Sequence, residues 1–236
     1  MSRSRSQAVA GRRAAATRRH GRQKFGSAAA VVALVLAGLL GWLVYQSQRG
    51  GDVPTPAHAS ADGTGLVDGA GPVTVEVWLD PHCPHCRTFE EQAGPTLDQL
   101  VTDGAITRIY HPVAFLDRFS TTKYSTRAAA SIGCAADEGA HVPYLETLLA
   151  AQPPAGGPGL SDAELVEVGV SAGTAGPGFA GCVTDGRYRD WIERATAAAA
   201  EADVTGTPTV RVNGTDVTPA GDAIVAAVRA AGAGAG

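Results

Sequence analysis

The sequence predicts an α/β domain whose elements follow the order β-α-β, several helices and then β-β-α, preceded by one N-terminal membrane helix. Three observations lead to this prediction. An alternating strand, "VTVEVWL", runs almost directly into an amphipathic helix that begins near residue 84. An Asn-Gly turn at 213–214 separates two short β-type runs near the C-terminus. An apolar run over residues 28–45 follows a tail that contains no acid.

The N-terminus reads as a signal anchor. Residues 1–27 carry eight basic side chains, and residues 28–45 are apolar throughout. As a helix, this run is roughly 27 Å long, close to the ~30 Å hydrocarbon core. The excess of basic residues before it predicts a cytoplasmic N-terminus and an extracytoplasmic domain in the cell membrane. Cleavage after the small-x-small triplet at 57–59 is the alternative, although it lies far from the apolar run.

The exported part is acidic. Residues 46–236 hold 11 of the 19 Lys and Arg and all 23 acids, which gives a formal charge of −12. An acidic domain argues against a nucleic-acid partner, and attraction to membrane lipid explains the basic tail. Residues 46–70 are rich in Gly, Pro, Ser and Ala, a composition typical of a flexible linker. One globular domain is therefore expected over residues 71–236.

The first half of this domain follows from simple periodicities. Val73 to Leu79 alternate in polarity, and the second face is apolar enough for the strand to be covered on both sides. The helix from Pro84 places Cys86, Phe89, Ala93, Leu97 and Leu100 on one stripe, which continues past Pro95. "AITRIYHPVAF" then reads as a second strand.

The second half begins with helices. Tyr124 and "VPYLETLLA" belong to two helical patterns, and Ser161 with Glu164 forms a capping-box signature for a third. Tyr188 and Trp191 mark another amphipathic helix. "TVRV", Asn-Gly and "TDV" then read as a hairpin, followed by a last helix over residues 220–231.

The stretch "LDPHCPHC" combines two cysteines with two histidines. Structural zinc sites usually take four ligands from two close pairs, and no second pair occurs elsewhere in the sequence. His82, Cys83, His85 and Cys86 cannot all converge from one strand-to-helix corner. A designed metal site is therefore not expected, and adventitious zinc binding stays open.

A redox dithiol fits this corner better. Cys83 lies at a helix N-terminus, where free N–H groups and the helix dipole favour the thiolate. Cys86 lies one turn later on the inward stripe, so Cys83 is the expected nucleophile and Cys86 the resolving thiol. Pro84 and His85 lie between them, and His85 can donate to the Cys83 sulfur or remain a solvated loop histidine. A stabilised thiolate makes the disulfide more oxidising.

A second signal lies in "VTGTPTV". Pro208 immediately precedes a strand, where its missing N–H should weaken pairing. A cis Thr207–Pro208 bond in a tight loop would resolve this, and an ordinary trans proline is the alternative.

These motifs together resemble the DsbA-like thiol–disulfide oxidoreductases of the thioredoxin superfamily, over about residues 72–233. The resemblance implies a thioredoxin fold with a helical subdomain inserted at about 118–200. It implies that Thr207 and Pro208 present backbone to the substrate, and the Thr207 hydroxyl is a further candidate for tuning Cys83. Thioredoxin-like proteins often carry a buried acid six positions before the first cysteine, but Val77 stands there, so that proton-transfer role is not carried over.

The resemblance also implies a structural disulfide between Cys134 and Cys182, with two buried free thiols as the alternative. It implies no cofactor. The expected function is a dithiol oxidase that acts on reduced exported proteins and is reoxidised by a quinone-linked membrane enzyme of the DsbB or vitamin K epoxide reductase type. A reductase or isomerase of the same fold, or a non-enzymatic anchored binding module, are the alternatives.

Overall fold

The computed structural model describes residues 34–42, 53–174 and 176–233 of the chain, which divides into the units 1–52 and 53–236. Residues 34–42 form a helix with exposed side chains. Within these described ranges, no helix has both the length and the apolar character that crossing a bilayer requires. The basic tail, the rest of the expected anchor at 28–45 and the first part of the expected linker lie outside the described residues.

The unit that begins at Val53 is built on a five-stranded mixed sheet with the order β1-β3-β2-β4-β5. The central strand β2 pairs in parallel with β3 and antiparallel with β4, while β1 and β5 pair antiparallel at the two edges. The strands are β1 (Leu66–Gly69), β2 (Val73–Leu79), β3 (Ile106–Pro112), β4 (Thr209–Val212) and β5 (Thr215–Val217).

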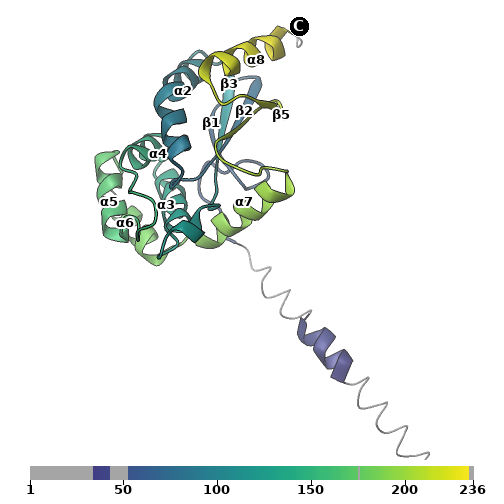
Figure 1. Ribbon diagram of the computed structural model, residues 1–236, viewed down its shortest axis with the longest axis vertical. Helices are drawn as coiled ribbons and strands as arrows, with labels where there is room; N and C mark the ends of the chain where they lie inside the picture. Colours follow the sequence, from purple (N-terminus) through teal and green to yellow (C-terminus); the bar gives the residue numbers. More distant parts are fainter. Residues whose placement is uncertain (1–33, 43–52, 175, 234–236) are drawn as a thin grey trace, which may run out of the picture. The chain divides into compact units, whose positions relative to one another are not determined.

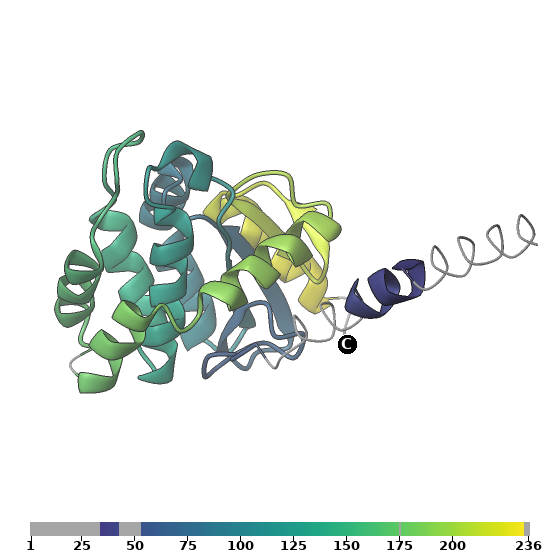
Figure 2. The ribbon, with the colours of Figure 1, turned by 90° about the horizontal axis from the view of Figure 1, so that it is seen from below.

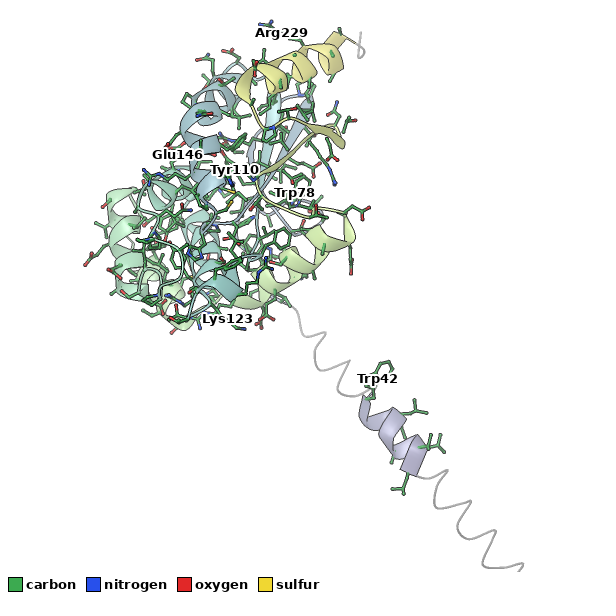
Figure 3. The ribbon with its side chains drawn as sticks, in the orientation of Figure 1. Trp42, Trp78, Tyr110, Lys123, Glu146 and Arg229 are labelled. Carbon is green, nitrogen blue, oxygen red and sulfur yellow. A yellow bond between two sulfur atoms is a disulfide. The ribbon has the colours of Figure 1, made fainter. Side chains whose placement is uncertain are left out.

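Helices cover both faces of this sheet (Figures 1 and 2). The helices α2 (Pro84–Thr102) and α8 (Gly221–Ala233) pack on one face, and α7 (Arg189–Glu201) lies on the other. Figure 3 shows the two faces through Tyr110, which is on the α2 side, and Trp78, which is on the α7 side. The expectation that the first strand is covered on both sides is therefore confirmed.

The chain between β3 and β4 is helical. Besides α7, it contains the short 3₁₀ helix η1 and four α-helices that pack on one another. The capping box expected before α5 is present, because the Ser161 hydroxyl accepts from the Glu164 N–H and the Glu164 carboxylate accepts from the Ser161 N–H. The elements are η1 (Asp117–Phe119), α3 (Tyr124–Asp137), α4 (His141–Ala150), α5 (Asp162–Ser171) and α6 (Pro177–Asp185).

The expected linker at 46–70 is wrong in its second half. Residues 66–69 form the edge strand β1, in which Leu66 is fully buried opposite Tyr110. The preceding segment is also attached to the helices. The Ala57 N–H donates to Asp137 Oδ1 at 3.0 Å, and the Trp191 indole donates to the Gly63 carbonyl at 2.7 Å. Two apolar residues, Leu66 and Val67, at the end of a stretch rich in Gly, Pro and Ser were too weak a signal for a strand.

The helix α2 sets the depth of Cys83 and Cys86. It continues through Pro95, as the sequence predicted, and its inward stripe is buried at Cys86, Phe89, Ala93 and Leu97. Cys83 precedes the first turn in an extended conformation, and Pro84 opens the helix. The first cysteine therefore lies at the rim of the domain and the second lies inside it.

Candidate active site

Cys83 and Cys86 lie in the reduced form at the carboxyl end of β2. The Cys86 N–H donates to the Cys83 carbonyl at 3.0 Å, which closes the first turn of α2. The side chain of Cys83 is 5 % exposed and that of Cys86 is fully buried. The geometry therefore gives a partner access to one sulfur and not to the other.

The two thiols differ strongly in acidity. A hydrogen bond from Cys86 lowers the pKa of Cys83 to about 5, with further contributions from the Thr207 hydroxyl and the backbone N–H groups of Cys86 and His85, against burial. Burial raises the pKa of Cys86 well above its ordinary value, and the hydrogen bond and charge of Cys83 raise it further. At neutral pH, Cys83 is thus a thiolate next to a protonated Cys86.

The loop before β4 completes the site. The Thr207–Pro208 bond is cis, and the neutral Cys83 thiol donates to the Thr207 carbonyl at 3.3 Å. The side chain of His85 is exposed, and it is the backbone N–H of this residue that lowers the pKa of Cys83. The structure therefore brings Cys83, Cys86 and Thr207 together. His85 lowers the pKa of Cys83 through its main-chain N–H and not through its imidazole ring.

Thr207→Val should raise the pKa of Cys83, because it replaces a hydrogen-bonding hydroxyl by a methyl group of similar size. We expect a rise of about one pKa unit, since a hydrogen bond to a charged group is worth roughly 1.5 kcal/mol. The reduction potential should then fall by about 30 mV, because the reduced form loses that stabilisation at neutral pH. The pKa is measured from thiolate absorbance. Thr215→Val, in the exposed part of β5, is the control, and an unchanged pKa for Thr207→Val would rule out this role.

Asp80 is a site residue that sequence reasoning missed. It directly follows β2, is fully buried, and accepts the His82 N–H at Oδ1 (2.8 Å) and the Leu116 N–H at Oδ2 (2.9 Å). Its carbonyl accepts the Cys83 N–H at 2.9 Å. Burial raises the pKa of its carboxyl to about 6, although the hydrogen bonds from the His82 and Leu116 N–H groups lower it. One carboxylate thus joins the active-site turn to the segment that follows β3.

The position six residues before Cys83 holds no acid, as the sequence states. Val77 is fully buried, while Glu76 extends to His111 Nε2 at 3.3 Å. A second buried acid, Glu90, lies one turn after Cys86 on α2 and accepts the Tyr110 hydroxyl at 2.8 Å. Burial raises the pKa of Glu90 to about 7. The two buried carboxyls of this region therefore come from the residue after β2 and from the second turn of α2.

A groove with a volume of about 600 Å³ opens beside Cys83. Four segments form it: the turn that leads into α2, the segment after β3, the loop between α4 and α5, and the loop before β4. Within the described part of the chain, no cluster of three or more His, Cys, Asp and Glu side chains is arranged to hold a metal. The active-site groove is lined by His82, Cys83, Pro84, His85, Phe115, Leu116, Arg118, Phe119, Ala155, Thr205, Gly206 and Thr207.

The other two cysteines form a disulfide away from this groove. Cys134 in α3 and Cys182 in α6 are joined with an S–S distance of 2.06 Å, and both are buried in the core. The bond spans a sequence separation of 48 residues and links two helices of the helical region. Because this disulfide is buried and does not line the groove, it is not accessible for exchange with a thiol that reacts at Cys83.

Comparisons with known proteins agree with this geometry. Residues 65–228 match the family model described as thioredoxin. A disulfide bond oxidoreductase (DsbG) from Mycobacterium tuberculosis is 34% identical, with a TM-score of 0.63 over 71% of this chain and 86% of that one. DsbA from the same organism is 34% identical, with a TM-score of 0.61 over 70% of this chain and 91% of that one. The chain belongs to the DsbA-type thiol–disulfide oxidoreductases of the thioredoxin family.

Two further similarities have a lower sequence identity or cover less of the chain. BdbD from Bacillus subtilis shares the fold of this DsbA-type protein, with a TM-score of 0.63 at 20% identity over 74% of this chain and 96% of that one. The serine/threonine-protein kinase PknE from Mycobacterium tuberculosis is 35% identical over 78 residues, which are 33% of this chain. The chain covers 14% of the length of that curated relative.

Proposed function

We propose that the protein is an extracytoplasmic dithiol oxidase that introduces disulfides into exported proteins through its Cys83–Cys86 pair. The observation that carries the proposal is the difference in acidity between the two thiols. Because the pKa of Cys83 is about 5, this thiol is ionised at neutral pH, and the stabilised thiolate favours the reduced state of the pair. Because stabilising the reduced form makes the disulfide a stronger oxidant, this site is suited to giving its disulfide away.

The exchange proceeds in two balanced steps. A thiolate of the client, meaning the reduced protein that receives the disulfide, attacks Cys83 and displaces Cys86, which takes up a proton because its pKa is high. A second client thiolate then attacks the client sulfur of the mixed disulfide, and Cys83 leaves as a thiolate. The client loses two electrons and the pair gains them. The protein next needs an oxidant, for which we propose a quinone-linked membrane enzyme of the DsbB or vitamin K epoxide reductase type.

The proposed location is the cell membrane, with residues 28–45 as an uncleaved anchor and the N-terminus in the cytoplasm. The support is the basic tail before the apolar run, together with the Cys134–Cys182 disulfide, a bond that persists in oxidising compartments. Full-length protein should stay in the membrane fraction after an alkaline wash, and a chain beginning at Val53 should be released. If both proteins were released, residues 28–45 would not anchor the chain in the membrane, and this part of the proposal would be wrong.

The decisive measurement is the reduction potential of the Cys83–Cys86 pair, equilibrated with glutathione buffers of known potential. We expect a value between about −270 mV, typical of thioredoxin, and about −120 mV, typical of DsbA. The Cys134→Ala/Cys182→Ala variant is the control that assigns the transition to the active pair. A potential below that of thioredoxin would favour a reductase, and failure to oxidise any reduced test protein would favour a binding module.

A further inference from the structure

The segment that follows β3 forms one wall of the active-site groove. We call residues 115–119 the groove wall. Phe115 and Leu116 are half-buried there, while Phe119 is 48% exposed. The guanidinium of Arg118 lies over the Phe119 ring, 4.7 Å from its centroid. Arginine and aromatic side chains are each enriched where proteins bind partners, and here both lie at the rim of the groove.

Arg118 has no acid to pair with. The exposed Arg87 pairs with Glu91 at 2.8 Å and the half-buried Arg211 with Asp216 at 2.6 Å, whereas Arg229 on α8, like Arg118, has no carboxylate partner among the described residues. Within residues 53–174 and 176–233, no carboxylate lies within ion-pair distance of Arg118. This cation is therefore available to a molecule that enters the groove.

Two acids in or beside the groove wall, Asp117 and Asp80, are turned away from the groove. Asp117 accepts the Thr126 N–H at 3.0 Å and the Thr126 hydroxyl at 2.6 Å, so both of its oxygens face α3. Asp80 is buried, and both of its oxygens accept backbone N–H groups. None of the described residues that line the groove carries a carboxylate, so Arg118 gives it a positive rim on a domain that is acidic overall.

We propose that Arg118 selects clients in which a carboxylate lies close to the reactive cysteine. An extended client segment that reaches Cys83 passes between the groove wall and the Thr205–Thr207 backbone, since both line the same groove. An Asp or Glu near the client cysteine then pairs with Arg118, whereas a Lys or Arg is repelled. The inference rests on the proposed oxidase function and leaves the exchange itself unchanged: the client thiolate still displaces Cys86 from Cys83.

The expected preference is modest. An exposed ion pair is worth up to about 1 kcal/mol, or about fivefold, and attraction of the acidic client adds to repulsion of the basic one. We therefore expect acidic clients to be oxidised about fivefold faster than basic clients at low salt. The preference should shrink as ionic strength rises, because salt screens exposed charges.

The test uses the full chain in its oxidised form and three unstructured peptides with two cysteines. The peptides are identical except for Asp, Gln or Lys two positions from the first cysteine, and peptide oxidation is followed by acid quenching and mass spectrometry. Arg118→Gln should bring the Asp-to-Lys rate ratio close to one, and Arg118→Glu should reverse it. Arg229→Glu, on α8 and labelled in Figure 3, is the matched control and should keep the wild-type ratio.

The outcomes separate the inference from the proposed function. Oxidation of all three peptides at equal rates by the wild-type protein, at low salt, overturns the role of Arg118 and leaves the oxidase function standing. A charge preference that survives in Arg118→Gln also overturns it. Failure to oxidise even the Gln peptide counts against the oxidase function itself. The wild-type ratio and its salt dependence decide the matter even if an Arg118 variant does not fold.

Discussion

Cys83→Ser should abolish disulfide transfer, reducing it to the rate of uncatalysed exchange. Cys83 supplies the accessible sulfur of the pair, and its low pKa makes it the better leaving group in the final step. Cys86→Ser should behave differently, because its Cys83 thiolate can attack the disulfide of an oxidised client and displace one client thiolate, while no internal thiol remains to release the resulting mixed disulfide. We therefore expect Cys86→Ser to accumulate covalent complexes with client proteins.

These outcomes are measured by the oxidation of a reduced test protein and by non-reducing gel electrophoresis. The Cys134→Ala/Cys182→Ala variant, which keeps the active pair, is the control and should transfer disulfides at nearly the wild-type rate. If Cys83→Ser kept full activity, or if mixed disulfides formed on Cys86 instead, the assignment of the two roles would be wrong.

The Cys134→Ala/Cys182→Ala variant should unfold with a free energy about 4 kcal/mol lower than that of the wild type. The disulfide closes a loop with a sequence separation of 48 residues, and closing such a loop removes about 4 kcal/mol of chain entropy from the unfolded state. The reduction potential of the Cys83–Cys86 pair should be nearly unchanged, because the disulfide lies in α3 and α6, outside the active-site groove.

Urea denaturation without reductant gives the free energy of unfolding for both proteins. Treating the wild-type protein with a mild reductant that opens only the active pair should not lower its midpoint, because the reduced pair is stabilised by the Cys83 thiolate. A double variant as stable as the wild type would show that the disulfide does not contribute to stability. Two titratable thiols at these positions in the denatured, unreduced wild-type protein would contradict the bond itself.

Elements that depend on neighbouring residues could be predicted from the sequence. Pro84 after an alternating strand placed the start of α2, and the Ser161–Glu164 pair placed the start of α5. The Asn213-Gly214 turn between two β-type runs placed the β4–β5 hairpin. Each signal works within a few residues, because caps and tight turns are local hydrogen-bonding patterns.

What the sequence did not reveal depends on contacts between distant segments. Asp80 becomes a buried clamp only because Leu116, 36 positions later, lies beside it. The groove wall gains its role from facing the loop that ends at Pro208, far along the chain. A search for a buried acid at one fixed position led to Val77, whereas the structure places its buried acids at Asp80 and Glu90. Periodicity alone cannot supply such pairings.

The strand β1 has a consequence for how the domain avoids self-association. It pairs with β3 from Leu66 opposite Tyr110 to Gly69 opposite Thr107, and so it covers what would otherwise be an open edge. A fragment cut at Gly71, the boundary suggested by composition, would expose the backbone N–H and C=O groups of β3 and empty the place of Leu66. An open, apolar strand edge recruits strands from other molecules. Residues 66–69, in a stretch whose composition resembles a linker, thus protect β3 from edge-to-edge aggregation.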